Sequence, residues 1–180
     1  MNAVVYAEAS HTPAAAEKGE AIIDQRNKQF VPYVTAIQAG SSILFPNSDN
    51  IRHHVYSLSH AKRFELPLYS GIPAKPVLFD KPGFVTLGCN IHDWMIAYVA
   101  VLPTRYFKLT ASKGEATLQD LPAGHYTVKV WHPLLRSRPE ESAQAVDLAA
   151  NGVRQMTFTL DLKPDFRARR APGLSTGGYP

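Results

Sequence analysis

The sequence has little of several features that would place a chain in a familiar class. It contains one cysteine in 180 residues, so it cannot form an internal disulfide. No apolar run approaches the ~18 residues expected of a membrane span, and we expect no spanning segment. The chain also opens without a charged stretch followed by an apolar one, so no signal peptide is visible. These features fit either a cytosolic protein or the processed form of an exported one.

An excess of positive charge is also absent from the body of the chain. Residues 1–105 carry nine lysines and arginines against eight acidic residues, and residues 106–162 carry six against six. Residues 163–180 carry four against one, and they account for most of the net charge of +4. A nearly neutral body argues against a nucleic-acid-binding face. We expect residues 163–180 to form a flexible, solvated basic tail.

Helix-like periodicity is scarce, whereas turn residues and short β-type runs are common. Fourteen prolines and eleven glycines separate short segments rich in Val, Ile, Tyr and Phe. This pattern is typical of many short strands joined by turns, and it predicts an all-β protein. We expect strands over residues 3–8, 21–25, 31–38, 42–46, 53–58, 62–69, 76–79, 83–87, 96–102, 107–110, 116–121, 125–132, 145–148 and 156–162.

The single cysteine lies in the most informative segment of the chain, residues 88–95. Cys89, His92 and Met95 have the spacing Cys-x-x-His-x-x-Met, which combines a thiolate, an imidazole and a thioether. Soft sulfur donors together with imidazole suit copper. Two histidines, one cysteine and a weak axial methionine describe a blue-copper electron-transfer site. The motif therefore predicts such a site, provided that a second histidine lies elsewhere in the chain.

The segment before the strand predicted over 53–58 supplies that second imidazole, from His53 or His54. Adjacent strand residues face opposite sides of a sheet, so only one of the two is expected to point inward. A site formed by one early histidine and a late loop is held by two strand ends. The protein scaffold would then fix the ligand geometry, which keeps reorganisation small during electron transfer.

Other interpretations of Cys89 account for less of the pattern. A single cysteine can be an inert buried thiol, or it can act as a nucleophile beside a distant histidine. Neither explains why Met95 follows His92 by three residues or why histidines precede the earlier strand. A structural zinc site is disfavoured because the chain has no Cys-x-x-Cys pair. We expect no catalytic residues, and no cofactor other than one copper ion.

These residues resemble the cupredoxin, or blue copper, family. The resemblance covers about residues 20–104, and its short ligand loop is similar to that of amicyanin and shorter at its methionine end than that of plastocyanin. It implies a Greek-key β-sandwich, a periplasmic or secreted location, and one copper ion held by His53, Cys89, His92 and Met95. His54 then stands where the family has asparagine. Asn47 either fastens the two ligand-bearing loops or is a simple turn residue.

A second resemblance covers residues 114–130, which read Gly-Glu-Ala-Thr-Leu-Gln-Asp-Leu-Pro-Ala-Gly-His-Tyr-Thr-Val-Lys-Val. This stretch resembles the carboxypeptidase-regulatory-like, or transthyretin-like, β-sandwich. An early strand of that family is similar to residues 3–7. The resemblance implies that a small sandwich formed by residues 1–9 and 105–162 is interrupted by an inserted copper domain at 20–104. The combination is similar to bacterial proteins labelled methylamine utilization proteins.

By these resemblances the expected function is one-electron transfer between redox proteins, with the edge of His92 as the port. Trp94 either contacts the partner or covers the site. Resemblance suggests a c-type cytochrome or an amine-oxidising dehydrogenase as partner. The alternative is a periplasmic protein that stores, senses or delivers copper with the same ligands. Neither function is enzymatic.

Overall fold

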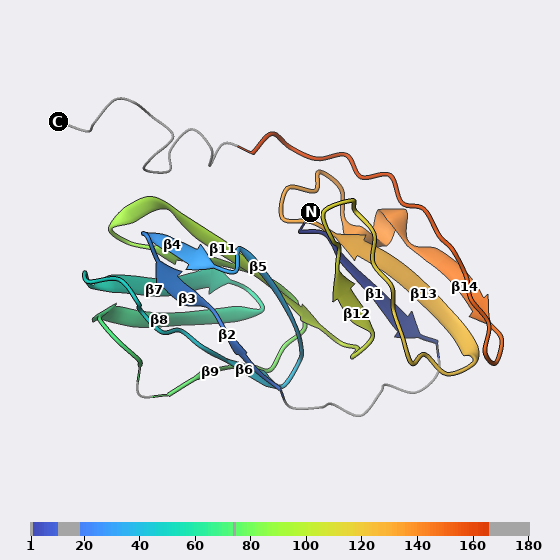
Figure 1. Cartoon of the computed structure of the whole chain (residues 1–180), viewed down its shortest axis with the longest axis horizontal. Helices are drawn as coiled ribbons and strands as arrows, with labels where there is room; N and C mark the ends of the chain where they lie inside the picture. The colour runs from blue at the N-terminus through green and yellow to red at the C-terminus, as the bar shows by residue number, and fades with distance from the viewer. Residues whose placement is uncertain (1, 11–18, 74, 166–180) are drawn as a thin grey trace.

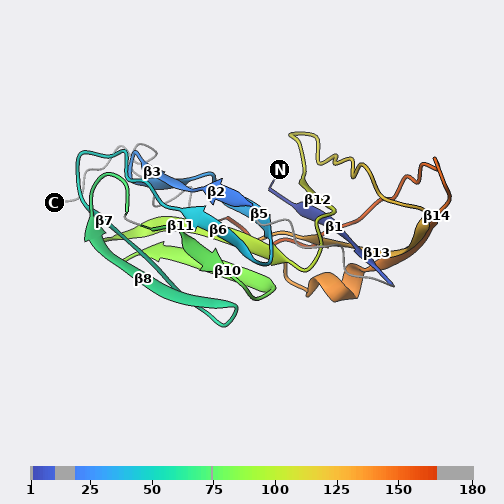
Figure 2. The ribbon, with the colours of Figure 1, turned by 90° about the horizontal axis from the view of Figure 1, so that it is seen from below.

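The computed structural model describes residues 2–10, 19–73 and 75–165 of the chain. Within these ranges the protein is all-β apart from one short 3₁₀ helix, η1 (Pro139–Ser142). Two groups of strands lie side by side along the long axis, as two perpendicular views show (Figures 1 and 2). The basic tail expected over 163–180 lies, beyond residue 165, outside the described residues. Among the helices of the described ranges, none is long and apolar enough to cross a membrane.

The first region, residues 19–104, contains two layers of strands. One layer is a five-stranded sheet, and β5 runs parallel to β11 while the other neighbours are antiparallel. In spatial order its strands are β5 (Val34–Gln38), β11 (His92–Leu102), β10 (Gly83–Cys89), β7 (His53–Ser59) and β8 (Lys62–Tyr69). The other layer is a three-stranded sheet and a hairpin, made of β2 (Glu20–Ile22), β6 (Ser41–Leu44) and β9 (Val77–Phe79), with β3 (Asp24–Arg26) and β4 (Gln29–Val31).

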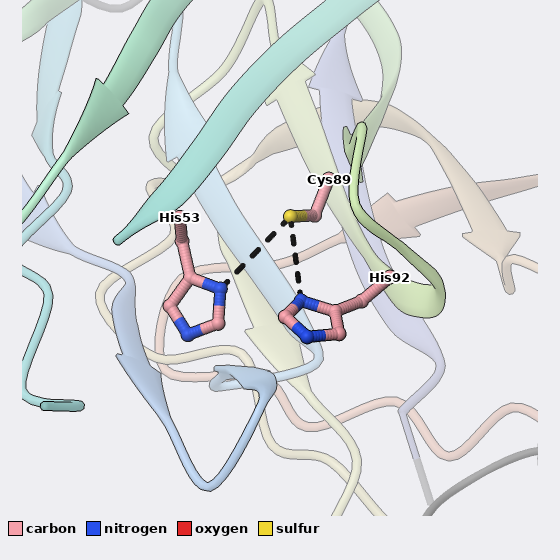
Figure 3. Close-up of side chains that lie close together, drawn as sticks. All are labelled: His53, Cys89 and His92. Carbon is pink, nitrogen blue, oxygen red and sulfur yellow. Dashed lines mark hydrogen bonds between the residues drawn. The ribbon is translucent and has the colours of Figure 1, made fainter. Parts of the chain in front are cut away.

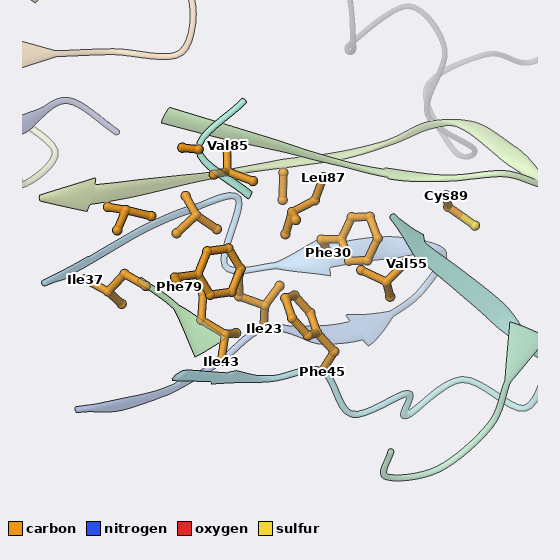
Figure 4. Close-up of a cluster of buried hydrophobic side chains, with 14 of the residues drawn as sticks. Ile23, Phe30, Ile37, Ile43, Phe45, Val55, Phe79, Val85, Leu87 and Cys89 are labelled. Carbon is orange, nitrogen blue, oxygen red and sulfur yellow. The ribbon is translucent and has the colours of Figure 1, made fainter. Parts of the chain in front are cut away.

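The core of the first region lies between these two layers (Figure 4). Phe45 and Phe79 are fully buried on the smaller layer, and they pack on either side of Phe64 at ring-centroid distances of 5.6 and 5.9 Å. Fully burying each such side chain contributes about 2–3 kcal/mol relative to leaving it exposed. The two sheets are therefore held at a fixed separation close to the site residues.

The site residues continue the inward alternation of this core. On β10 the side chains of Val85, Leu87 and Cys89 point inward, two residues apart, and Cys89 ends the strand. His53 begins β7, and Met95 lies near the start of β11; both side chains are buried. Since successive inward positions on a strand share one face, the strand pattern itself brings these donors to one end of the sandwich.

Two expected strands of the first region are each divided in the structure. The strand expected over 21–25 is divided at Ile23: β2 pairs with β6, and β3 pairs with β4 while Gln25 keeps backbone hydrogen bonds to residues just beyond β6. The strand expected over 31–38 breaks at Pro32, which has no N–H to donate to a ladder. The first break coincides with pairing to β4, which the local sequence pattern does not reveal, whereas Pro32 is a local signal for the second.

The second region contains one four-stranded sheet. In spatial order its strands are β12 (Phe107–Leu109), β1 (Val4–Ala9), β13 (Gly124–Trp131) and β14 (Gln144–Leu148). The first strand of the chain therefore lies between two strands that follow residue 105: Val4 faces Leu109 on one side and Trp131 on the other. The resemblance of residues 3–7 to an early strand of the transthyretin-like sandwich implied this pairing.

The second layer of this region differs from the sandwich we expected. The segments 116–121 and 156–162, expected as strands, form no strand in the described structure, and Leu162 makes an isolated bridge with Leu135. Their apolar side chains still cover one face of the sheet, where Leu118, Leu121, Met156 and Phe158 pack on Ala7, Tyr126 and Val128. The three-residue spacing of Leu118 and Leu121 does not match the two-residue period of a strand, so this layer is irregular.

The other face of the second sheet joins the first region. Val4 and Trp131 pack there against Leu102, on the outward face of β11. The Trp131 ring stacks on Phe84 of β10, with ring centroids 4.5 Å apart and planes nearly parallel at 2°. The two regions therefore share a buried apolar junction, at the end of β11 remote from Cys89 and His92.

Candidate metal centre

Three potential metal ligands from different parts of the chain meet at one end of the first region (Figure 3). One donor atom from each of His53, Cys89 and His92 lies within 4.8 Å of the others. The Cys89 sulfur is 4.0 Å from Nδ1 of His53 and 3.8 Å from Nδ1 of His92. Both imidazoles thus turn the same nitrogen toward the thiol.

The hairpin between β10 and β11 explains how Cys89 and His92 come together. The two-residue turn formed by residues 90 and 91 places them opposite each other across the ladder. The next pair along the ladder is Gly88 with Ile96, so residues 93–95 bulge from β11. A bulge redirects side chains relative to a regular strand. Here it accompanies the burial of Met95.

The distances between the donors fit a trigonal metal ion. Metal–sulfur and metal–imidazole bonds of about 2.3 and 2.1 Å, the lengths found at zinc, separated by about 120°, give a sulfur–nitrogen distance of about 3.8 Å. The observed 3.8 and 4.0 Å match this value. A thiolate with two imidazoles is also the donor set that soft, redox-active metals prefer. The residues therefore fit copper in both spacing and chemistry.

Met95 lies close to the same place. It is 1% exposed, and it belongs to the same buried cluster as Cys89. Cys89 and Met95 also line one surface hollow of about 430 Å³ that opens beside β7 and β10. The structure thus places the predicted methionine at the correct end of the sandwich, and its role as an axial ligand stays a prediction.

The two adjacent histidines of β7 have different partners. Nδ1 of His53 faces the sulfur, and no part of the His53 side chain is exposed. His54 instead pairs through Nε2 with Glu65 on β8, at 2.8 Å. The alternation expected for neighbouring strand residues is present. It brings His53, and not His54, to Cys89.

Asn47 holds the loop that precedes His53. Its side-chain Nδ2 donates to the carbonyl oxygens of Ile51 and Tyr69, at 2.9 and 2.8 Å. Its Oδ1 accepts the backbone N–H of Asp49 at 3.1 Å. These bonds tie its own loop to the end of β8. Asn47 is thus more than a simple turn residue, and within the described part of the chain its side-chain hydrogen bonds do not reach the Cys89 loop.

Tyr69 braces the same loop from the side of β8. Its hydroxyl donates to the carbonyl of Phe45 at 2.5 Å and accepts from Nε2 of the fully buried Gln25 at 2.6 Å. Burial raises the pKa of Tyr69 to about 12. The hydroxyl therefore stays protonated, and able to donate, at neutral pH.

Asp49 is a part of the site that sequence reasoning missed. Its Oδ2 lies 2.7 Å from Nε2 of His53, on the side of the ring opposite Cys89. Burial raises the pKa of this carboxyl, but hydrogen bonds from the Lys28 backbone, His53 and the Asn27 backbone outweigh it and hold the pKa below its ordinary value. The sequence offers one signal, the spacing Asn47-x-Asp49 ahead of His53, and this spacing by itself assigns the aspartate no role.

Trp94 and His92 form the more accessible side of the site. The two rings are 5.1 Å apart, and the Trp94 indole N–H donates to the carbonyl of Lys28 at 3.1 Å. Burial lowers the pKa of His92, and His53 and Lys28 lower it further against an opposing effect of Asp49. The neutral imidazole that a metal requires is therefore favoured. Trp94 is held beside His92 by the β3–β4 turn, an arrangement that its sequence position did not predict.

Comparison with known proteins gives matches only at the level of structure. No protein-family model matches the sequence, and a search of curated proteins found no match. A copper-containing nitrite reductase from Thermus scotoductus SA-01 is 22% identical with a TM-score of 0.44, over 53% of this chain and 25% of that one. This chain thus spans about a quarter of the nitrite reductase.

Two shorter proteins are matched over almost their whole length. A purple cupredoxin from Nitrosopumilus maritimus is 21% identical with a TM-score of 0.41, over 46% of this chain and 99% of that one. A reduced amicyanin variant is 17% identical with a TM-score of 0.42, over 54% and 99%. Similarity at this level does not establish a shared function, which has to be argued from the residues of this chain.

Proposed function

We propose that this protein is a type 1 copper protein that carries single electrons between redox partners. His53, Cys89 and His92 would hold one copper ion in a trigonal arrangement, with Met95 as a weak axial donor. The observation that carries the proposal is a buried thiol with an imidazole Nδ1 on either side, at 3.8 and 4.0 Å. One-electron exchange between Cu(I) and Cu(II) is the chemistry that the metal supplies when bound.

The chain's own contribution is to fix the donors before any metal binds. His53, Cys89 and Met95 have between 0 and 5% of their surface exposed and occupy inward positions of three strands. Close-packed interiors resist changes in side-chain position. Donors held in this way keep one compromise geometry for both oxidation states. This supports a carrier over an enzyme or a protein that releases its metal.

Electrons would enter and leave at the His92 side of the site. His92 is the only partly exposed member of the three-residue ligand cluster described in the structure, since His53 and Cys89 are buried. The exposed Ile91 precedes it in the turn. A redox protein would dock on this face. A c-type cytochrome or an amine-oxidising dehydrogenase are the partners we propose, in the periplasm or outside the cell.

We also propose that residues 20–104 form a copper domain inserted into a second domain made of residues 1–9 and 105–162. The pairing of β1 with β12 and β13 supports this division, because it closes one sheet from both ends of the chain. The second domain packs on the first at the end of β11 remote from the ligands. It therefore leaves the His92 face free for a partner.

An optical titration tests the function directly. Adding Cu(II) to the purified chain should give an intense visible band from thiolate-to-copper charge transfer, and voltammetry should show a reversible one-electron wave. Cys89→Ser should abolish the band, because a hydroxyl does not replace the thiolate donor. Near-ultraviolet circular dichroism should show that this variant is still folded.

A Cys89→Ser protein that keeps the intense band would refute the ligand assignment. If the wild-type chain instead binds Cu(I) tightly but forms no stable coloured Cu(II) state, the carrier function is wrong. The copper-handling alternative would then replace it.

A further inference from the structure

A carboxylate lies directly behind the buried histidine of the site. His53 points Nδ1 toward the Cys89 sulfur, and its other nitrogen, Nε2, is 2.7 Å from Oδ2 of Asp49. An ionised carboxylate can only accept a hydrogen bond, so Nε2 must carry the proton. Nδ1 then presents a free lone pair toward Cys89. The pair thus selects the ring tautomer that a metal needs.

Asp49 is itself held in place by backbone groups. Its two carboxylate oxygens accept the N–H groups of Asn27 at 2.7 Å and Lys28 at 2.8 Å. Both residues lie in the β3–β4 turn and have left-handed φ angles of 54° and 56°. Two consecutive N–H groups pointing at one carboxylate form a fixed anion cradle. The carboxylate is only 13% exposed, which limits screening by solvent.

The same turn reaches the second ligand-bearing loop. The carbonyl of Lys28 accepts the indole N–H of Trp94 at 3.1 Å, and the Trp94 ring lies 5.1 Å from the His92 ring. One turn therefore contacts the early ligand through Asp49 and lies beside the late ligand through Trp94. In these two links the turn bonds to Asp49 and to Trp94, and not to the side chains of His53 and His92 themselves.

We propose that Asp49, held by the β3–β4 turn, is a positioning residue that fixes the orientation of His53 and lowers the reduction potential of the copper centre. This inference rests on the proposed copper function. A carboxylate bonded to a ligand histidine makes the imidazole a stronger donor and adds negative charge near the metal. Both effects stabilise Cu(II) more than Cu(I).

The decisive variant is Asp49→Asn, which keeps the shape and an acceptor oxygen but removes the charge. Its matched control is Asp93→Asn, which removes an equal charge from an exposed residue next to His92 in the chain. Loss of a partner of a ligand histidine typically weakens metal binding 10–100-fold. We expect Asp49→Asn to lower Cu(II) affinity about tenfold more than Cu(I) affinity. That ratio corresponds to a rise of about 59 mV in the potential, measured by voltammetry at one pH and at high salt.

A second measurement needs no copper. Nitrogen-15 NMR of the metal-free wild-type protein should show His53 protonated on Nε2, with Nδ1 bare. Asp93→Asn should leave this pattern unchanged. If Asp49 acted only on folding, the folded Asp49→Asn variant would keep both the His53 tautomer and the reduction potential of the wild type.

The outcomes separate this inference from the copper function. If the wild-type chain forms no coloured Cu(II) site, the proposed function fails and the potential has no meaning. If the wild type is coloured but Asp49→Asn shifts the potential no more than Asp93→Asn, only the role of Asp49 is refuted. A metal-free His53 whose neutral ring carries its proton on Nδ1 and not on Nε2 would also refute it.

Discussion

Each of the two regions contains a histidine paired with an aspartate, and the two pairs differ chiefly in burial. In the first region the His53 side chain is fully buried and Asp49 is 13% exposed. In the second region His125 of β13 pairs with Asp147 of β14, and these side chains are 68% and 79% exposed. Solvent screens an exposed pair and leaves both side chains mobile. Burial, together with the backbone N–H groups that hold Asp49, allows the first pair to fix the orientation of the His53 ring.

The sheets of the two regions differ in a similar way. In the first region the inward-facing residues at two strand ends, His53 and Cys89, are potential metal ligands. They lie where β7 begins and β10 ends, at the edge of a packed core. The sheet of the second region has its faces covered by an irregular layer and by the junction, and its strand ends bring no such cluster together among the described residues. A site therefore needs strand ends that converge on an open edge of the core.

The largest expected effect concerns the two neighbouring histidines of β7. His53→Ala removes a donor that faces the sulfur and should weaken copper binding more than about 100-fold, beyond the effect of losing a ligand's partner. His54→Ala removes a side chain bonded to Glu65 and should weaken binding less than about tenfold. Competition with a chelator of known affinity measures both. Comparable losses would overturn the choice of His53.

The junction offers a contrast in stability. Trp131→Ala should lower the free energy of unfolding by about 3–5 kcal/mol, because it removes a buried ring stacked on Phe84. Trp94→Ala is the matched control, and because its ring is only partly buried it should cost less than about 2 kcal/mol. Denaturant unfolding gives both values. If Trp131→Ala lowered the free energy of unfolding no more than the small amount expected for Trp94→Ala, the junction would contribute little to holding the regions together.

A smaller effect is expected at Tyr69. Tyr69→Phe removes the donor to the Phe45 carbonyl and one of the two acceptors of the Gln25 amide, which still donates to the Pro46 carbonyl. It should cost about 1–3 kcal/mol at neutral pH. Burial raises the pKa of Tyr69 to about 12, above the ordinary value of 10. The folded state thus holds this proton more tightly, so the associated stability is complete below pH 10 and is lost as pH rises toward 12.

The measurement for Tyr69 is the free energy of unfolding of both proteins at several pH values. The difference between wild type and Tyr69→Phe should narrow above pH 10. A difference that stays constant up to pH 12 would show that burial does not shift this hydroxyl.

The smallest effect is expected at the exposed pair. Asp147→Asn should change the free energy of unfolding by less than about 0.5 kcal/mol, because solvent already screens the interaction of Asp147 with His125. Asp49→Asn should destabilise the metal-free protein clearly more, since its neighbours are backbone N–H groups. Thermal unfolding at low and high salt compares the two. Similar losses of stability for Asp147→Asn and Asp49→Asn would show that burial does not make one pair more important than the other.

Much of the site could be predicted because its signals are local. The Cys-x-x-His-x-x-Met spacing identifies three donors in one segment. That segment was expected as a loop between strands at 83–87 and 96–102, whereas in the structure the strands extend to Cys89 and from His92. Alternation also allowed only one of His53 and His54 to face Cys89. Asp49 could not be found in this way, because its role depends on a turn more than twenty residues earlier in the chain.

The fold shows the same division between local and distant signals. The all-β class follows from strand-like runs and turn residues, and the resemblance of residues 3–7 to an early strand of the transthyretin-like sandwich implied the pairing of β1 with strands after residue 105. The break at Pro32 and the irregular layer at 116–121 also have local signals, the missing N–H and the three-residue spacing of leucines. The break at Ile23 has none, because it coincides with pairing to β4, and tertiary pairing overrides the local β-pattern there.

Strand β11 links the two regions and therefore affects how the molecule unfolds. Its eleven residues extend about 30 Å, from His92 at the ligand turn to Leu102 in the junction. Alternate residues of the strand belong to different cores: Val99 and Val101 pack in the core of the first region, and Ala100 and Leu102 pack in the junction. Cooperative opening units follow such shared elements, and amide hydrogens in their middle exchange only through the largest openings. The two regions should accordingly melt in a single transition, with the central amides of β11 among the slowest to exchange.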